Sequence, residues 1–108
     1  MSEDLAPREE IITLLDEYEP LLSPSQSETL TSYYRYDLSL SEIADEKGVS
    51  RSAINDAIKK GIGKLRELES SLGLVKLKED IRLGLEGILE SEDLDQAKRL
   101  ASDMKGRL

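Results

Sequence analysis

Apolar residues recur at steps of three and four along this chain, and helix start and stop signals divide them into separate stretches. In the last third, these apolar positions are Leu74, Leu77, Ile81, Leu85 and Ile88, followed by Leu94, Ala97, Ala101, Met104 and Leu108. Such spacing lines one side of an α-helix. No stretch alternates apolar and polar residues as a half-buried strand does. The sequence therefore predicts an all-α fold.

Local signals predict where most helices begin and end. Pro7 suits a helix start, and Pro20 stops that helix. Capping boxes at residues 23–26 and 39–42 predict two further starts. Gly48 and Gly73 are expected to end helices, because a left-handed backbone costs glycine little.

The remaining boundaries follow from single residues. Ser50 is expected to cap a helix that runs to about Leu72, and Ser91 with Glu92 and Asp93 is expected to mark the start of the last helix. Residues 1–6 are expected to form a frayed tail. In a chain with so few aromatic residues, at least one of Tyr33 and Tyr34 should lie in the core.

The boundary between two parts of the chain is expected at residues 70–73. We predict an N-terminal helical lobe over residues 1–72, containing a helix-turn-helix at 40–66. A C-terminal helical pair over residues 73–108 would follow it. The fold is thus expected to be a helix-turn-helix bundle extended by a helical pair.

Composition excludes most catalytic chemistry. The 108 residues include no Cys and no His, which removes disulfides, Cys or His zinc sites, thiol nucleophiles and histidine bases. We expect no catalytic residue, no cofactor and no metal site. No apolar run approaches the roughly 18 residues of a membrane helix, and no signal peptide is readable. We therefore expect a cytoplasmic protein without a membrane partner.

Residues 47–66 differ from the rest of the chain in their charge. The net charge is −8, yet residues 47–66 hold six basic residues and one acid. This is the only basic stretch in an acidic chain, and such an asymmetry indicates what kind of partner binds there.

The same segment has the pattern of a helix-turn-helix, in which a short helix and a longer one are joined through a glycine. Ala44 is expected to face the second helix, where a larger side chain would clash. Gly48 allows the turn. Val49 and Ile54 are expected to fill the angle between the two helices.

The second helix of this motif has two distinct sides. Ile54, Ile58 and Leu65 fall on an apolar side, and basic and amide side chains fall on the other. We predict a nucleic-acid-binding set of Ser50, Arg51, Ser52, Asn55, Lys59, Lys60, Lys64 and Arg66. The alternative is an ordinary solvated helix surface. Gly61 and Gly63 favour close packing over a bend in this helix.

Two motifs carry a family resemblance. Residues 39–68, SLSEIADEKGVSRSAINDAIKKGIGKLREL, resemble the helix-turn-helix of region four of bacterial sigma factors. Residues 14–60, including LLDEYEPLLSPSQ and a double tyrosine, are similar to the YlxM family of small bacterial proteins. Members are usually encoded beside the GTPase of the signal recognition particle. The resemblance implies an all-α, non-enzymatic protein with a regulatory role in that pathway.

Three functions remain open. The first is regulation of the signal recognition particle pathway, through binding of the particle's GTPase, its RNA or both. The second is a DNA-binding transcriptional regulator that uses the same helix. The third is a purely protein-binding helical adaptor.

The C-terminal pair carries more apolar surface than two helices hide on each other. Its main stripes are expected to pack together, leaving Leu83, Leu89 or Leu100 exposed unless the first helix or a second copy covers them. Because twofold dimers are the commonest assembly, we expect a homodimer through residues 74–108.

Overall fold

The computed structural model describes residues 5–108, and in this part of the chain it contains six α-helices and no strand. The elements are α1 (Arg8–Tyr18), the 3-10 turn η1 (Glu19–Leu21), α2 (Pro24–Leu30), the π-helical turn η2 (Thr31–Arg35), α3 (Leu40–Lys47), α4 (Arg51–Leu72), α5 (Leu74–Glu90) and α6 (Leu94–Gly106). The predicted all-α fold is confirmed. The tail expected at residues 1–6 lies mostly outside the described residues.

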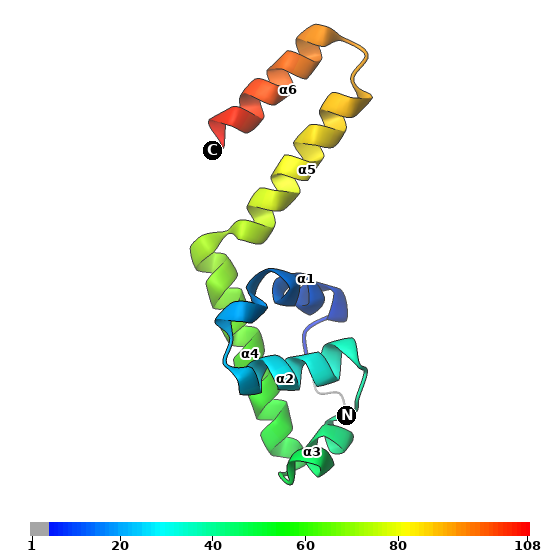
Figure 1. Ribbon diagram of the computed structural model, residues 1–108, viewed down its shortest axis with the longest axis vertical. Helices are drawn as coiled ribbons and strands as arrows, with labels where there is room; N and C mark the ends of the chain where they lie inside the picture. The colour runs from blue at the N-terminus through cyan, green and yellow to red at the C-terminus, as the bar shows by residue number, and fades with distance from the viewer. Residues whose placement is uncertain (1–4) are drawn as a thin grey trace. The chain divides into compact units, whose positions relative to one another are not determined.

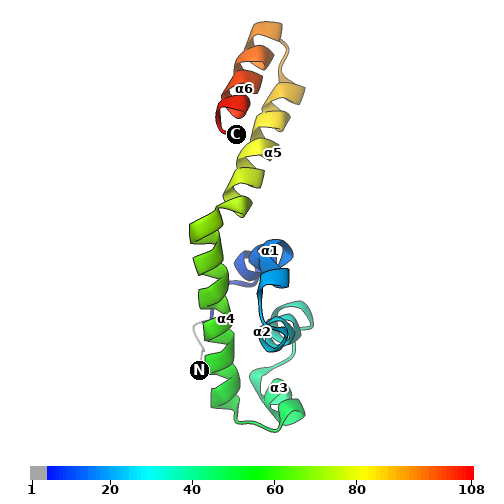
Figure 2. The ribbon, with the colours of Figure 1, turned by 60° about the vertical axis from the view of Figure 1, so that its left-hand side comes forward.

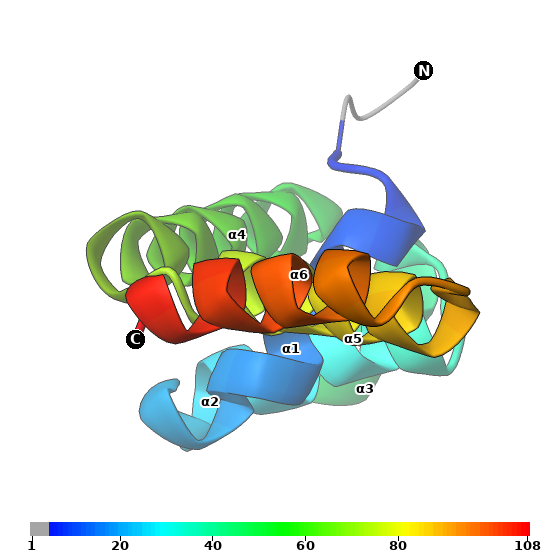
Figure 3. The same cartoon turned by 90° about the horizontal axis from the view of Figure 1, so that it is seen from above.

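Contacts divide the chain into two compact units, residues 1–72 and residues 73–108, here called the N-terminal unit and the C-terminal unit. In the N-terminal unit, α1, α2 and α3 all pack against α4. Figures 1 and 2 show these three helices on one side of α4, and the view from above in Figure 3 agrees. The long helix α4 is therefore the support on which this unit is built.

Both capping boxes form as predicted. The Ser23 hydroxyl accepts a hydrogen bond from the Gln26 amide at 3.1 Å, and the Gln26 side chain accepts one from the Ser23 amide at 3.2 Å. Ser39 and Glu42 repeat this exchange at 3.0 and 2.8 Å. Backbone hydrogen bonds from Ser39 hold the pKa of Glu42 below its usual value. Each box satisfies amide groups that a helix start leaves unpaired.

Two helices end directly before a glycine, and the last helix begins directly after the predicted start signal at residues 91–93. Gly48 and Gly73 have left-handed φ angles of 69° and 62°, as predicted. The last helix, however, is capped by Asp93, whose carboxylate accepts from the Asp95 amide at 2.9 Å. Ser91 instead bonds the backbone of Asp93. The carboxylate is the better-placed acceptor, so α6 begins at Leu94.

The segment after α2 departs from a regular helix. It continues as the π-helical turn η2, closed by the Tyr36 amide donating to the Thr31 carbonyl at 3.1 Å. Asp37 then adopts a positive φ of 56°. Tyr34 is buried in this turn, and its hydroxyl donates to the Ala6 carbonyl at 2.8 Å. Burial raises the pKa of Tyr34 to about 12. At least one of the paired tyrosines is thus in the core, as predicted.

The core of the N-terminal unit is aliphatic, with two tyrosine rings. Its buried apolar residues are Ile11, Leu14, Leu15, Tyr18, Leu22, Leu30, Tyr34, Leu40, Ile43, Ala44, Ile54, Ile58, Ile62 and Leu65. The Tyr18 hydroxyl donates to a carboxylate oxygen of Glu69, 51 residues along the chain. This bond ties the end of α1 to the last turns of α4.

The absence of a side chain at Gly61 allows α2 to pack closely against α4. A Cβ atom at this position would lie 2.8 Å from the Cδ1 atom of the buried Leu30. At Gly63, a Cβ atom would have no neighbour within 4 Å. Close packing, the reading that the sequence favours, therefore accounts for Gly61 and does not account for Gly63.

The C-terminal unit is a pair of helices without a buried residue. α5 and α6 pack on each other, and Gly84 and Gly87 lie where Met104 and Leu100 approach. The expectation that both main stripes would be hidden is wrong at Leu85, Leu94, Ala101 and Leu108, which are exposed. Leu83 and Leu89 are also exposed, whereas Leu100 is half-buried against Gly87. Two helices alone offer too little surface to enclose a core.

Candidate nucleic-acid interface

The turn between α3 and α4 is set by local bonds. The Gly48 and Val49 amides donate to the carbonyls of Asp45 and Ala44, at 3.4 and 3.0 Å. The Ser50 hydroxyl accepts from the Ala53 amide at 3.0 Å, so Ser50 caps α4 as predicted. This arrangement fixes the direction in which α4 leaves the turn.

The packing inside the turn is only partly as predicted. Ala44 and Ile54 are buried between the helices. Val49, expected to help fill the angle, is 46% exposed. Ala44 and Ile54 therefore fill the angle between the helices without a buried Val49 side chain.

The first turns of α4 present the accessible part of the candidate set. Arg51, Ser52, Lys59 and Lys60 are exposed, as is the single acid Asp56. Within residues 5–108, Lys59 and Lys60 form no ion pair. Unpaired ammonium groups on a helix surface are free to approach phosphate oxygens.

Further along α4, the cations of the candidate set are engaged. The Arg66 guanidinium binds Glu10 of α1 through two bonds, Nε to Oε2 at 2.8 Å and Nη2 to Oε1 at 3.0 Å. This hydrogen bonding lowers the pKa of Glu10 and raises that of Arg66. Lys64 lies 3.6 Å from Glu67 on its own helix. Lys64 and Arg66 therefore carry less free charge than the sequence suggests.

Asn55 sits in an unexpected environment. The residue is half-buried, and its Oδ1 atom is buried without a hydrogen-bond partner among residues 5–108. Reading an adenine edge uses both the carbonyl and the amino group of such a side chain. In this conformation the carbonyl does not reach the surface, so the sequence pattern overstated the exposure of Asn55.

A further ion pair, which sequence reasoning missed, fastens the motif to the rest of the unit. Lys47 at the end of α3 pairs with Glu28 of α2. This hydrogen bond lowers the pKa of Glu28. Both Glu28 and Glu10 are far from their partners in sequence, and no local signal could have identified the pairs.

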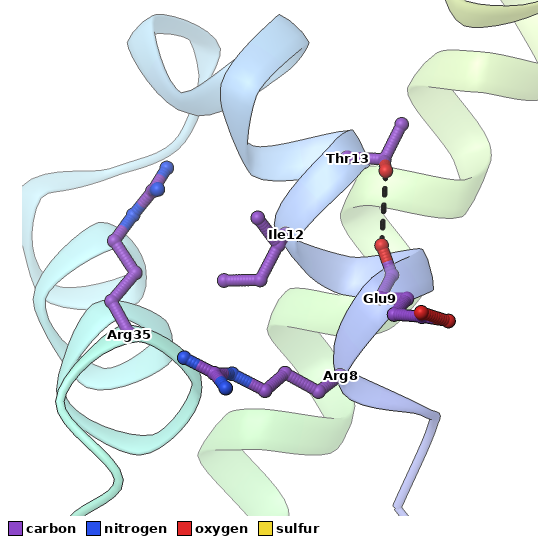
Figure 4. A pocket seen from close by; sticks show the side chains of 5 residues that line it. All are labelled: Arg8, Glu9, Ile12, Thr13 and Arg35. Carbon is purple, nitrogen blue, oxygen red and sulfur yellow. Dashed lines mark hydrogen bonds between the residues drawn. The ribbon is translucent and has the colours of Figure 1, made fainter.

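One hollow of the N-terminal unit is lined by residues of α1 and η2. It measures about 630 Å³ and is lined by Arg8, Glu9, Ile12, Thr13 and Arg35 (Figure 4). Its arginines are engaged, since Arg8 Nε donates to the Tyr34 carbonyl at 2.8 Å and Arg35 pairs with Asp16 at 3.1 Å. None of the candidate residues lines it.

No group of three or more acidic side chains in residues 5–108 is arranged to hold a metal ion. In the same part of the chain, no helix is both long enough and apolar enough to cross a membrane.

The chain thus has the arrangement of a helix-turn-helix protein. A short capped helix, α3, is followed by a turn at the left-handed Gly48 and by a longer helix, α4, whose first half carries the exposed Lys59 and Lys60. A family model described as "Putative helix-turn-helix protein, YlxM / p13 like" matches residues 5–105. The chain belongs to this family, UPF0122, and the resemblance to YlxM proteins is confirmed. The family's description is that of a helix-turn-helix protein, not of an enzyme.

Curated relatives agree over most of the chain. A UPF0122 protein of Fusobacterium nucleatum is 38% identical over 95 residues, covering 88% of this chain and 92% of the relative. One of Symbiobacterium thermophilum is 39% identical over 98 residues, with the same coverage. One of Malacoplasma penetrans is 46% identical over 66 residues, covering 61% of this chain and 62% of the relative.

Proposed function

We propose that this chain is a non-enzymatic regulatory protein that binds nucleic acid through the first half of α4. One observation carries the proposal: Lys59 and Lys60 are exposed and without an ion pair in residues 5–108, on the second helix of a helix-turn-helix. Arg51 and Ser52 lie about two turns before them on the same helix. The binding surface is therefore shorter than the eight-residue set, which included the engaged Lys64 and Arg66.

The resemblance to YlxM proteins supports a role in a particular cellular pathway. We propose that the protein regulates the signal recognition particle pathway in the cytoplasm, with the particle's RNA or its GTPase as partner. A homodimer through residues 74–108 presents two copies of α4, which suits two sites on one nucleic acid. Major-groove DNA is the alternative target of the same helix surface.

Salt dependence tests the nucleic-acid contact. The variant Lys59→Ala with Lys60→Ala removes two phosphate contacts, so the log–log salt slope is expected to fall by about 1.8 on duplex DNA or about 1.4 on single strands. The matched control is Lys98→Ala with Arg99→Ala, an exposed pair on α6 with the same change of charge. A double-lysine variant that binds like the parent at low and moderate salt contradicts the proposal.

A purely protein-binding adaptor is the second candidate. The observation that favours it is the commitment of Arg66 and Lys47 to acids on other helices. Residues 1–72 hold fifteen acids and eight bases, so they suit a basic protein partner. Purified protein that shifts neither RNA nor DNA at low salt, yet is captured from lysate after nuclease treatment, favours this function.

A further inference from the structure

The C-terminal unit has a hollow with a leucine beside it. The hollow measures about 300 Å³ and is lined by Asp80, Leu83, Gly84, Leu100, Asp103, Met104 and Arg107. Gly84 and Met104 lie in close contact in it, because a Cβ atom on Gly84 would meet the Met104 sulfur at 2.5 Å. Leu83 remains 55% exposed. The exposed Leu83 side chain therefore forms part of the wall of a hollow that is lined by apolar and charged residues.

We infer that a second copy of this chain occupies the hollow, with Leu83 of each copy inserted into the hollow of the other. This inference rests on the homodimer of the proposed function and specifies its contact. In a twofold interface the same patch meets itself, so a knob must lie next to a hole on one surface. Leu83 and the hollow satisfy this requirement.

Charge favours a second copy over a strongly charged partner. Residues 73–108 hold eight acids and seven bases, whereas residues 1–72 hold fifteen acids and eight bases. Two nearly neutral surfaces approach without net repulsion. An interface through the N-terminal unit would instead bring together two surfaces with a large excess of acids.

The rim of the hollow carries both signs of charge. Arg107 Nη1 binds Asp80 Oδ2 at 2.7 Å, and Lys76 lies 3.4 Å from the same oxygen. Asp103 forms no ion pair with another residue of 5–108. Mixed charges around an apolar centre match the polar rim and apolar core of protein interfaces.

The test replaces the proposed knob in the full chain. Leu83→Asp is expected to raise the dimer dissociation constant at least about 100-fold, because the symmetry removes two buried leucines at once. The matched control is Leu21→Asp in the N-terminal unit, since Leu21 is also 55% exposed. Light scattering over a concentration series measures the dissociation constants.

A second variant reports proximity without disturbing the fold. The chain has no cysteine, so Leu83→Cys carries a single thiol. A short bismaleimide should link two copies of Leu83→Cys and should not link two copies of Leu21→Cys. Because Leu83 is half-exposed in one chain, the cysteine is expected to be tolerated there.

The outcomes separate this contact from the rest of the proposal. Dissociation by Leu83→Asp together with thiol-specific linking supports the inference. A dimer that survives Leu83→Asp and fails to link overturns this contact and leaves the homodimer standing. A parent chain that is monomeric at tens of micromolar overturns both. Nucleic-acid binding is measured independently of all three results.

Discussion

The N-terminal and C-terminal units are both helical, but they are stabilised in different ways. In residues 5–72, three shorter helices pack on α4, and side chains from all four helices are buried. In residues 73–108, two helices contact each other and no side chain is buried. Regular apolar spacing is equally clear in both sequences. Apolar spacing therefore predicts helices, while the number of helices around a core decides how much surface is hidden.

Truncating one leucine in each unit should give the largest difference between the units, measured as the loss in the free energy of unfolding. Leu65→Ala empties a fully buried position in α4, so we expect a loss of about 2–5 kcal/mol in the free energy of unfolding. Leu85→Ala on α5, where the leucine is 49% exposed, should cost less than about 1 kcal/mol. Urea unfolding at low protein concentration measures both values. Equal losses would show that the C-terminal unit is buried in solution.

Adding a methyl group tests how tightly each unit is packed. Gly61→Ala places a Cβ atom 2.8 Å from the Cδ1 atom of the fully buried Leu30, while Gly84→Ala places one against the half-buried Met104. Gly63→Ala serves as the baseline, because its Cβ atom has open space. All three variants share the gain of about 1 kcal/mol that alanine brings to a helix.

Against this baseline, Gly61→Ala is expected to be less stable by about 1–3 kcal/mol. Gly84→Ala should fall closer to Gly63→Ala, since the Met104 side chain is flexible and has space to move. Thermal unfolding of the three variants gives the order. A Gly61→Ala variant as stable as Gly63→Ala would mean that the α2–α4 contact is looser than described.

Acid titration tests the ion pair that links α1 to α4 and should give the smallest effect. The folded-state pKa of Glu10 lies below its usual 4.5, so its contribution is complete above that pH and is lost as the pH falls through the lowered pKa. Because both side chains are partly exposed, Glu10→Gln should cost less than about 1 kcal/mol at neutral pH.

The stability difference between the parent chain and Glu10→Gln should therefore shrink towards zero on acidification to about pH 3. Urea midpoints of both proteins across this range measure it. Glu9→Gln is the neighbouring control, because Glu9 is exposed at the adjacent position. A difference that stays constant or grows in acid contradicts the assignment of the Glu10–Arg66 pair.

The features that the sequence predicted correctly depend on residues only a few positions apart in the chain. The capping boxes at Ser23 and Ser39 and the left-handed Gly48 depend on neighbours in the chain. The engagement of Arg66 could not be predicted in this way, since its partner Glu10 is 56 residues away. The same applies to Asn55, whose carbonyl is buried by the tertiary fold. The sequence thus predicted the second helix of the helix-turn-helix and overestimated the number of its cations that are free of ion pairs.

The distribution of tyrosines gives the chain a built-in optical label. All four tyrosines lie in the N-terminal unit, two of them buried at Tyr18 and Tyr34, and the chain has no tryptophan or phenylalanine. Near-ultraviolet absorbance and intrinsic emission therefore report on residues 1–72 alone. The backbone signal in the far ultraviolet reports on both units. Melting curves recorded at the two wavelengths will coincide only if the units unfold together, with no dye or tag required.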